Sequence, residues 1–102
     1  MPRFRRGSRD RNHSAIQRAL ESLGVTCVDV SNCTDAFDII AGYRGVTFAV
    51  EVKRADGKPS QRALRPSQAE KHDAWNGRPI EVVRTLDDCA EVVERVMRES
   101  SG

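Results

Sequence analysis

Four short apolar runs of this chain have the spacing of β-strands. In 37–42 (FDIIAG) and 46–52 (VTFAVEV) apolar and other side chains alternate, whereas 25–30 (VTCVDV) and 80–84 (IEVVR) are rich in β-branched residues. A period of two is typical of a strand with one buried face. The short, glycine-containing segment between the second and third runs predicts a hairpin.

Three other segments have the spacing of amphipathic helices. We expect helices over 14–24, over 66–77 and after Thr85, which is a candidate N-cap. The first and last carry apolar stripes at Ile16, Ala19, Leu20 and Leu23, and at Cys89, Val92, Val93, Val96 and Met97.

Capping residues suggest where the first helix begins and ends. Ser14 with Gln17 predicts a capping box, and Asn12 is a rival N-cap. Gly24 is a natural stop.

The second helix follows the polar loop 54–65. Pro66 fits a first-turn position. Ser67 with Glu70 predicts a capping box, and Gly77 is the expected end.

The predicted order is helix, three strands, helix, strand, helix. This order favours an α/β fold in which helices flank a mixed sheet. At 102 residues the chain suits one domain, which we place at 12–99. With 38% hydrophobic and 31% charged residues, the composition is that of an ordinary globular domain rather than a disordered one.

The sequence also indicates a compartment. No apolar run approaches the length of a membrane span, and the basic N-terminus lacks the apolar region of a secretory signal. Cys27, Cys33 and Cys89 are odd in number and lack a C-x-x-C spacing. We therefore expect free thiols in a cytoplasmic protein, with a zinc site involving the two histidines as the alternative.

The positive charge is concentrated at the N-terminus. The net charge is +2, but residues 1–11 (MPRFRRGSRDR) carry +4, so the other residues sum to −2. Such a segment is either a flexible solvated arm or a contact with nucleic-acid phosphates. The candidate DNA-contacting residues are Arg3, Arg5, Arg6, Arg9 and Arg11 in this arm, together with Arg62 and Arg65 in the polar loop.

The hairpin geometry predicts which side chains share a face. If Tyr43 and Arg44 form the turn, paired residues have numbers that sum to 87, and Asp38 lies opposite Ala49. Glu51 is then diagonal to Asp38 on the same face, at about 7 Å or less between Cβ atoms. Lys53 shares this face, whereas the opposite, core face carries Phe37, Ile39, Phe48, Val50 and Val52.

Two carboxylates that converge from neighbouring strands repel each other. A divalent cation relieves this repulsion, and oxygen ligands suit Mg²⁺ or Mn²⁺. A lysine beside such a site can orient an attacking water or stabilise charge that develops on a phosphate. Asp38, Glu51 and Lys53 therefore suit phosphodiester hydrolysis; the alternative is that Glu51 and Lys53 are solvent-facing residues of a half-exposed strand.

At this point the sequence resembles the PD-(D/E)XK nucleases. The segment FDIIAGYRGVTFAVEVK looks like their core motif, an aspartate followed by a hairpin and E-x-K. The continuation resembles the small viral-type replication-repair (VRR-NUC) branch, with matches at Pro66, Gln68, Trp75 and Gly77. The resemblance covers about residues 10–98 and implies a restriction-endonuclease-like core.

The resemblance also implies roles for particular residues. It implies that Asp38, Glu51 and the main-chain carbonyl of Val52 bind Mg²⁺ or Mn²⁺, that Lys53 is catalytic, and that Gln68 lies near the site or the DNA backbone. Because the branch is similar to the Holliday-junction resolvases, it implies a homodimer that cuts branched DNA in phage or viral replication and repair.

Two positions depart from the family pattern. Phe37 replaces the proline before the motif aspartate, and Ala15 stands where the first helix often carries a metal-site glutamate. Glu21 is on the wrong face of that helix to substitute. Asp35 is then either a substitute ligand or an ordinary loop residue.

Three readings of function therefore remain. The first is a structure-selective, metal-dependent DNA endonuclease. The second is a DNA-binding module that keeps the nuclease fold with weak or no activity. The third is a nicking or single-strand nuclease.

Five further residues have two readings each. His72 is either a proton relay or a surface histidine, and His13 either touches DNA or is incidental. Trp75 is either a core residue, the reading we favour, or a platform for base stacking. Tyr43 and Arg44 either reach DNA or a partner subunit, or are exposed turn residues.

Overall fold

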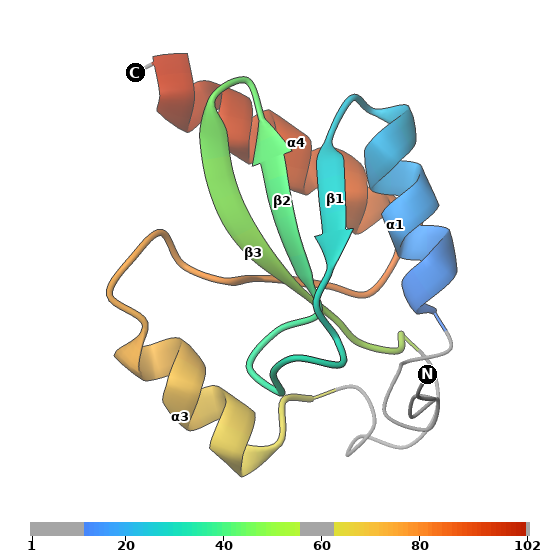
Figure 1. Cartoon of the computed structure of the whole chain (residues 1–102). Coiled ribbons are helices and arrows are strands. Elements are labelled where there is room, and N and C mark those ends of the chain that lie inside the picture. Colours follow the sequence, from blue (N-terminus) through green and yellow to red (C-terminus); the bar gives the residue numbers. More distant parts are fainter. Residues whose placement is uncertain (1–11, 56–62, 102) are drawn as a thin grey trace.

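The computed structural model describes residues 12–55 and 63–101 of the chain (Figure 1). The arm 1–11 and Arg62 lie outside the described residues. The elements follow the predicted order: α1 (His13–Ser22), β1 (Thr26–Asp29), β2 (Ile39–Tyr43), β3 (Val46–Val52), α3 (Pro66–Ala74), β4 (Glu81–Val83) and α4 (Leu86–Ser101).

The four strands form one mixed sheet in the order β1-β2-β3-β4. β1 pairs antiparallel with β2, β2 pairs antiparallel with β3, and β3 pairs parallel with β4. The parallel pair requires a crossover connection, and α3 lies within it. The predicted α/β class with a mixed sheet is confirmed.

The hairpin turn is formed by Arg44 and Gly45, not by Tyr43 and Arg44. Tyr43 pairs with Val46, and the two residues between them have φ angles of 50° and 84°. A two-residue turn with positive φ at both positions matches the right-handed twist of the strands. The predicted register is therefore wrong by two residues: Ile39, for example, pairs with Val50. Because the side-chain period is also two, the residues within β2 and β3 keep their predicted faces. Phe37, which directly precedes β2, is the exception, because it does not join the core.

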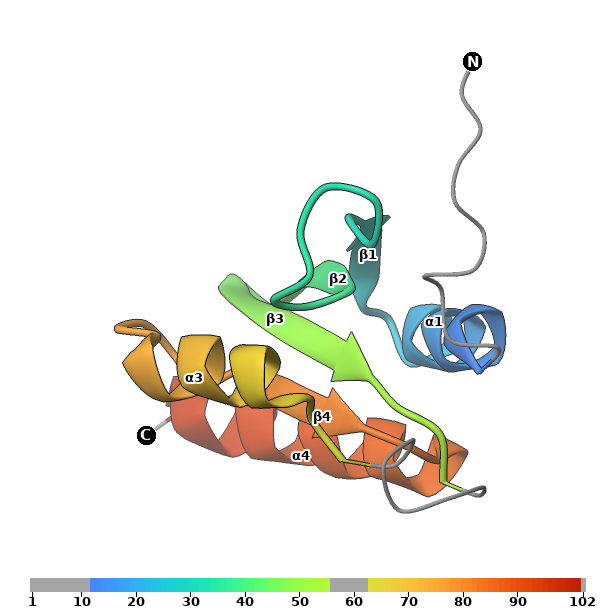
Figure 2. The ribbon, with the colours of Figure 1, turned by 90° about the horizontal axis from the view of Figure 1, so that it is seen from below.

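One face of the sheet, which we call the core face, packs against α1 and α4 (Figure 2). The helices and strands contribute apolar side chains that are at most 8% exposed. These are Ile16, Leu20, Val25, Ile39, Ala41, Phe48, Val50, Val52, Val83, Cys89, Val92, Val93 and Val96. Met97, predicted to lie in the α4 stripe, is instead 41% exposed.

The boundaries of α1 and α4 confirm two predicted caps and correct one. Gly24 has a φ of 96° just past the end of α1. Thr85 caps α4, because its Oγ1 accepts the N–H of Asp88 at 3.1 Å while Oδ2 of Asp88 accepts the N–H of Thr85 at 3.1 Å. The Ser14 box is wrong, because α1 begins one residue earlier and Asn12 occupies the N-cap position.

Helix α3 lies apart from α1 and α4 (Figure 1). It begins with Pro66 at the predicted first position, but Arg65 occupies the N-cap position, so the Ser67 capping box is wrong. It ends at Ala74 rather than at Gly77. Gln68 is its only buried residue.

Two aromatic residues do not belong to the core that the sequence predicted. Trp75 is 44% exposed. Phe37 precedes β2, is half-buried, and packs edge-to-face against Trp75 with 5.6 Å between ring centroids. Both lie outside the core cluster and line one pocket together with Ile40 and Ala49.

The three cysteines are unpaired, and burial raises the pKa of Cys27 and Cys89 to about 11. Within the described ranges, none of the helices is both long enough and apolar enough to cross a membrane.

Candidate active site

The face of β3 opposite the core, which we call the site face, carries Ala49, Glu51 and Lys53. Glu51 is only 3% exposed, although its side chain points away from the core. Its burial argues against the alternative that Glu51 is a solvent-facing residue of a half-exposed strand. A carboxylate is rarely buried without partners. The contacts of Glu51 therefore describe the chemistry of this face.

Gln68 of α3 covers Glu51. Its Nε2 donates to Oε2 of Glu51 at 2.9 Å and to the carbonyl of Asp35 at 3.0 Å. Its Oε1 accepts the N–H of Arg65 at 3.2 Å. The two acceptors around Nε2 and the donor beside Oε1 determine the orientation of the amide. Gln68 thus joins the start of α3, the 30–38 loop and β3 through one side chain that is 3% exposed.

Lys53 lies beside the same carboxylate oxygen. Its Nζ is 3.7 Å from Oε2 of Glu51, and its side chain is 14% exposed. The other oxygen of Glu51, Oε1, is buried and has no hydrogen-bond partner in the part of the chain that the structure describes. Leaving such an atom unpaired costs about 1–3 kcal/mol or more.

Asp38 reaches β3 from the start of β2. Its backbone N–H donates to the carbonyl of Val50 at 2.9 Å, and its Oδ2 accepts the N–H of Val52 at 2.8 Å. Asp38 therefore lies beside Val50–Val52 rather than opposite Ala49. In an extended strand the N–H and C=O of one residue point to the same side, so the carbonyl of Val52 faces the Asp38 side of β3.

The surroundings of Glu51 change the pKa of its carboxyl group. Burial, together with the nearby carboxylate of Asp38, raises the pKa of Glu51 to about 8. Lys53, the hydrogen bond from Gln68, and Arg65 act in the opposite direction but do not cancel the effect. Burial and the neighbouring Asp38 therefore favour the protonated form of Glu51.

The end of β3 is tethered to its neighbours by Asn12. The side-chain amide of Asn12 donates to the carbonyl of Arg84 at 2.7 Å and to that of Lys53 at 3.4 Å. The sequence predicts Asn12 only as a candidate N-cap. The sequence carries no local signal for its second role, because both partners are more than 40 residues away.

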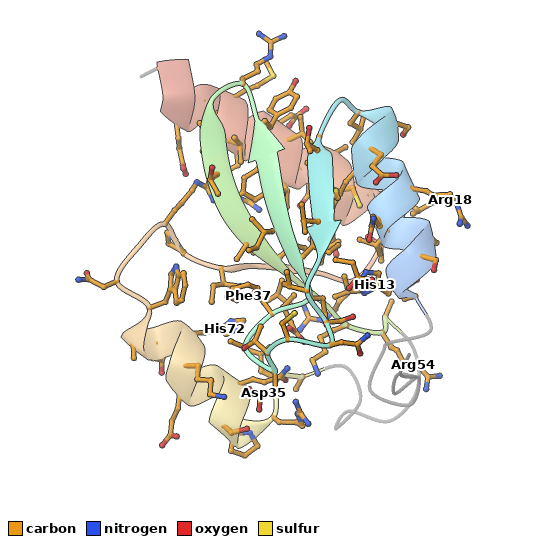
Figure 3. The ribbon with its side chains drawn as sticks, viewed as in Figure 1. His13, Arg18, Asp35, Phe37, Arg54 and His72 are labelled. Atoms are coloured by element: carbon orange, nitrogen blue, oxygen red, sulfur yellow. The ribbon has the colours of Figure 1, made fainter. Side chains whose placement is uncertain are left out.

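The side chains of Asp35 and His72 connect the 30–38 loop to α3 and do not contact Glu51. The exposed side chain of Asp35 forms an ion pair with Lys71, which lowers the pKa of Asp35. Nε2 of His72 lies 2.7 Å from the carbonyl oxygen of Ala36. Figure 3 shows Asp35 and His72 between the 30–38 loop and α3. Both contacts hold α3 against this loop, and therefore help keep Gln68 over Glu51.

The first helix contributes no carboxylate to the site. Ala15 is exposed, whereas the buried side of α1 carries His13, Ile16 and Leu20. An acid at position 15 would thus point to solvent. His13 is fully buried, and its Nε2 lies 3.1 Å from Oε1 of Gln17 and 3.5 Å from Oδ2 of Asp29 (Figure 3).

The donor set matches a magnesium-type ion better than zinc. Within residues 12–55 and 63–101, no three His, Cys, Asp or Glu side chains are grouped closely enough to hold a metal ion. Mg²⁺, however, is usually bound through one or two carboxylates and keeps several waters. Asp38, Glu51 with its unpartnered Oε1, and the carbonyl of Val52 fit that pattern.

Of the predicted site residues, the structure brings together Asp38, Glu51, Val52, Lys53 and Gln68. Arg65 is exposed at the start of α3, close enough to influence Glu51. No protein-family model, no curated protein and no solved structure matches this chain.

Proposed function

We propose that this protein is a metal-dependent DNA endonuclease with a restriction-endonuclease-like core, similar to the VRR-NUC branch of the PD-(D/E)XK nucleases. The observation that carries the proposal is the state of Glu51. Its carboxylate is buried on the site face with one unpartnered oxygen, beside Asp38 and two residues before Lys53. A purely structural carboxylate would instead have both oxygens paired.

The chain's own residues have distinct parts in this proposal. Asp38, Glu51 and the carbonyl of Val52 would hold Mg²⁺ or Mn²⁺. When bound, such an ion stabilises charge on a phosphate and makes bound water a better nucleophile. Lys53 orients the attacking water or stabilises the charge that develops on the phosphate. Gln68 fixes the position of Glu51 through its 2.9 Å hydrogen bond.

Branched DNA is the proposed substrate and a homodimer the proposed assembly. Arg65 supports DNA binding because it is exposed next to the site, where a cation attracts the phosphate backbone. Two sites in a dimer would allow opposing strands of one junction to be cut. These parts of the proposal also rest on the basic composition of 1–11 and on the resemblance of the sequence to junction-cutting nucleases.

The deciding experiment is a cleavage assay with Mn²⁺ or Mg²⁺ on four-way, flap, linear and single-stranded DNA. We expect the protein to cut branched DNA, and Glu51→Gln and Lys53→Ala to abolish cutting while the chain stays folded. Glu70→Gln is the matched control for Glu51→Gln, because it makes the same change at an exposed position of α3. Cleavage that survives both site changes contradicts the mechanism.

A second candidate is a DNA-binding module with the same fold and no activity. The absence of a third acidic, histidine or cysteine side chain near Asp38 and Glu51 in the described residues favours it. Mn²⁺ titration followed by calorimetry separates the two. Salt-sensitive DNA binding with no detectable Mn²⁺ binding would support the module and contradict the nuclease.

A further inference from the structure

A cavity of about 280 Å³ opens beside the candidate active site. Its walls come from β2, β3 and the segment that follows α3. They are formed by Phe37, Ile40, Thr47, Phe48, Ala49, Trp75, Gly77 and Arg78. Most of this lining is apolar and three of its members are aromatic, which is the composition of a ligand pocket rather than of a solvated surface.

The aromatic wall is exposed but held in place. Trp75 is 44% exposed and Ile40 is 40% exposed, so the cavity faces solvent. Phe37 contacts Trp75 at an interplanar angle of 79°. A Cβ at Gly77 would lie 3.0 Å from Nε1 of Trp75. Because glycine has no Cβ, the indole can pack against this position.

The other wall is fixed by ion pairs. Arg78 contacts Oε2 of Glu81 at 2.8 Å and Oε1 of Glu99 at 2.6 Å. Its guanidinium carbon lies 5.6 Å from the centroid of the Phe48 ring. The cavity is therefore largely formed before a ligand arrives.

The cavity adjoins the carboxylates through the chain itself. Phe37 directly precedes Asp38, and Ala49 lies two residues before Glu51 on the site face. Two residues of a strand span about 7 Å. Nucleotides of one strand are separated by about 3.4 Å, so a phosphate at Glu51 lies within about two nucleotides of the cavity.

We propose that this cavity binds one unstacked nucleobase of the DNA strand whose phosphate lies at Asp38, Glu51 and Lys53. This proposal rests on the proposed nuclease function and names its substrate as DNA with an unpaired base beside the cleaved bond. Aromatic side chains stack on any base, and Thr and Arg hydrogen-bond base edges. Thr47 supplies such a hydroxyl, and Arg78 lines the same cavity.

The size of the cavity favours a single ring system over a protein partner. Small-molecule pockets measure about 300–1,000 Å³, so this one accommodates little more than one base. A stable contact between protein copies buries about 800 Å² on each partner, which requires a wider surface than this cavity.

The protein carries its own probe, because Trp75 is its only tryptophan. The full chain in EDTA is titrated with a single-stranded oligothymidylate and with an abasic deoxyribose-phosphate strand of equal length. We expect the thymidylate, but not the abasic strand, to quench the tryptophan fluorescence. Equal quenching by both strands, or quenching by neither, would overturn the proposal.

Variants are compared by the anisotropy of a labelled oligothymidylate. Trp75→Ala should weaken binding at least about fivefold, and Trp75→Phe should restore most of the loss. Leu86→Ala is the matched control, because Leu86 is a 59% exposed apolar residue at the start of α4 and does not line the cavity. Equal affinity of Trp75→Ala and Leu86→Ala for the oligothymidylate contradicts the proposal. A shift of Trp75→Ala from dimer to monomer in sedimentation also contradicts it, because the cavity would then be a contact between protein copies.

Cleavage separates this proposal from the nuclease assignment. Duplexes with and without one unpaired thymidine are cut with Mn²⁺ by the wild type and by Trp75→Ala. Preference for the unpaired base that disappears in Trp75→Ala supports the cavity. Cutting without this preference overturns only the proposal that the cavity binds a base. Base-dependent quenching without any cutting overturns only the proposed nuclease function.

Discussion

The side-chain amide of Gln68 donates a 2.9 Å hydrogen bond to the buried carboxylate of Glu51 across 17 residues of sequence. One residue comes from the first turn of α3 and the other from the middle of the sheet. Through this contact, Gln68 covers Glu51 on the site face, where the carboxylate is buried.

Gln68→Ala should destabilise the protein by about 1–3 kcal/mol. The change removes a buried donor and leaves Oε2 of Glu51 with fewer partners, which carries a desolvation cost. Urea unfolding measures the difference in free energy. Ser67→Ala, one residue away and exposed, is the control and should change stability by less than about 0.5 kcal/mol. Equal effects of the two changes would mean that the hydrogen bond contributes nothing.

Stability should fall as pH rises toward 8, because the pKa of Glu51 rises from 4.5 to about 8 on folding. Between these two values the folded state binds more protons than the unfolded state, so each rise in pH favours unfolding. The slope from this one group is at most about 1.4 kcal/mol per pH unit.

Glu51→Gln should remove that slope, because the amide stays neutral at every pH. Urea unfolding at several pH values between 5 and 8 compares the free energy of unfolding of the variant with that of the wild type. These pH values cover most of the range between the pKa of 4.5 and the raised pKa of about 8. Glu70→Gln is the exposed control and should keep the wild-type slope. Parallel pH profiles for wild type and Glu51→Gln would refute the raised pKa.

Gly45→Ala should destabilise the hairpin by about 1–2 kcal/mol. Gly45 has a φ of 84°, which a residue with a Cβ adopts at a cost, and no atom lies within 4 Å of an added Cβ. The loss therefore reports the backbone conformation alone. Gly42→Ala is the matched control, because it has equally open space without a positive φ, and should be neutral or slightly stabilising. Thermal unfolding distinguishes the two; a neutral Gly45→Ala would argue against this turn.

Thr85→Ala should lower the free energy of unfolding by about 1 kcal/mol. Oγ1 of Thr85 accepts the N–H of Asp88 at the start of α4, and the alanine side chain has no acceptor for it. Urea unfolding with Ser67→Ala as the control checks this value. An unchanged midpoint for Thr85→Ala would show that the hydrogen bonds that Asp88 accepts are sufficient to cap α4.

The sequence by itself determined the elements, their order and the faces of the strands. Alternation along β3 separates Phe48, Val50 and Val52 from Glu51 and Lys53, and this period is a local property that any register shift of two preserves. The turn was misplaced because Tyr43-Arg44 and Arg44-Gly45 both fit a hairpin of similar length. Only the latter has the glycine at the second position of positive φ.

Only the tertiary structure decided that Glu51 is buried, that Gln68 covers it, and that Trp75 and Phe37 line a cavity instead of the core. Periodicity states which side of a strand a residue faces, but not which distant element covers that side. The position of α3 depends on contacts of Gln68 and His72 with residues of the 30–38 loop, and these contacts connect segments more than 30 residues apart. No local pattern encodes such contacts, so the burial of the site appears only in the folded chain.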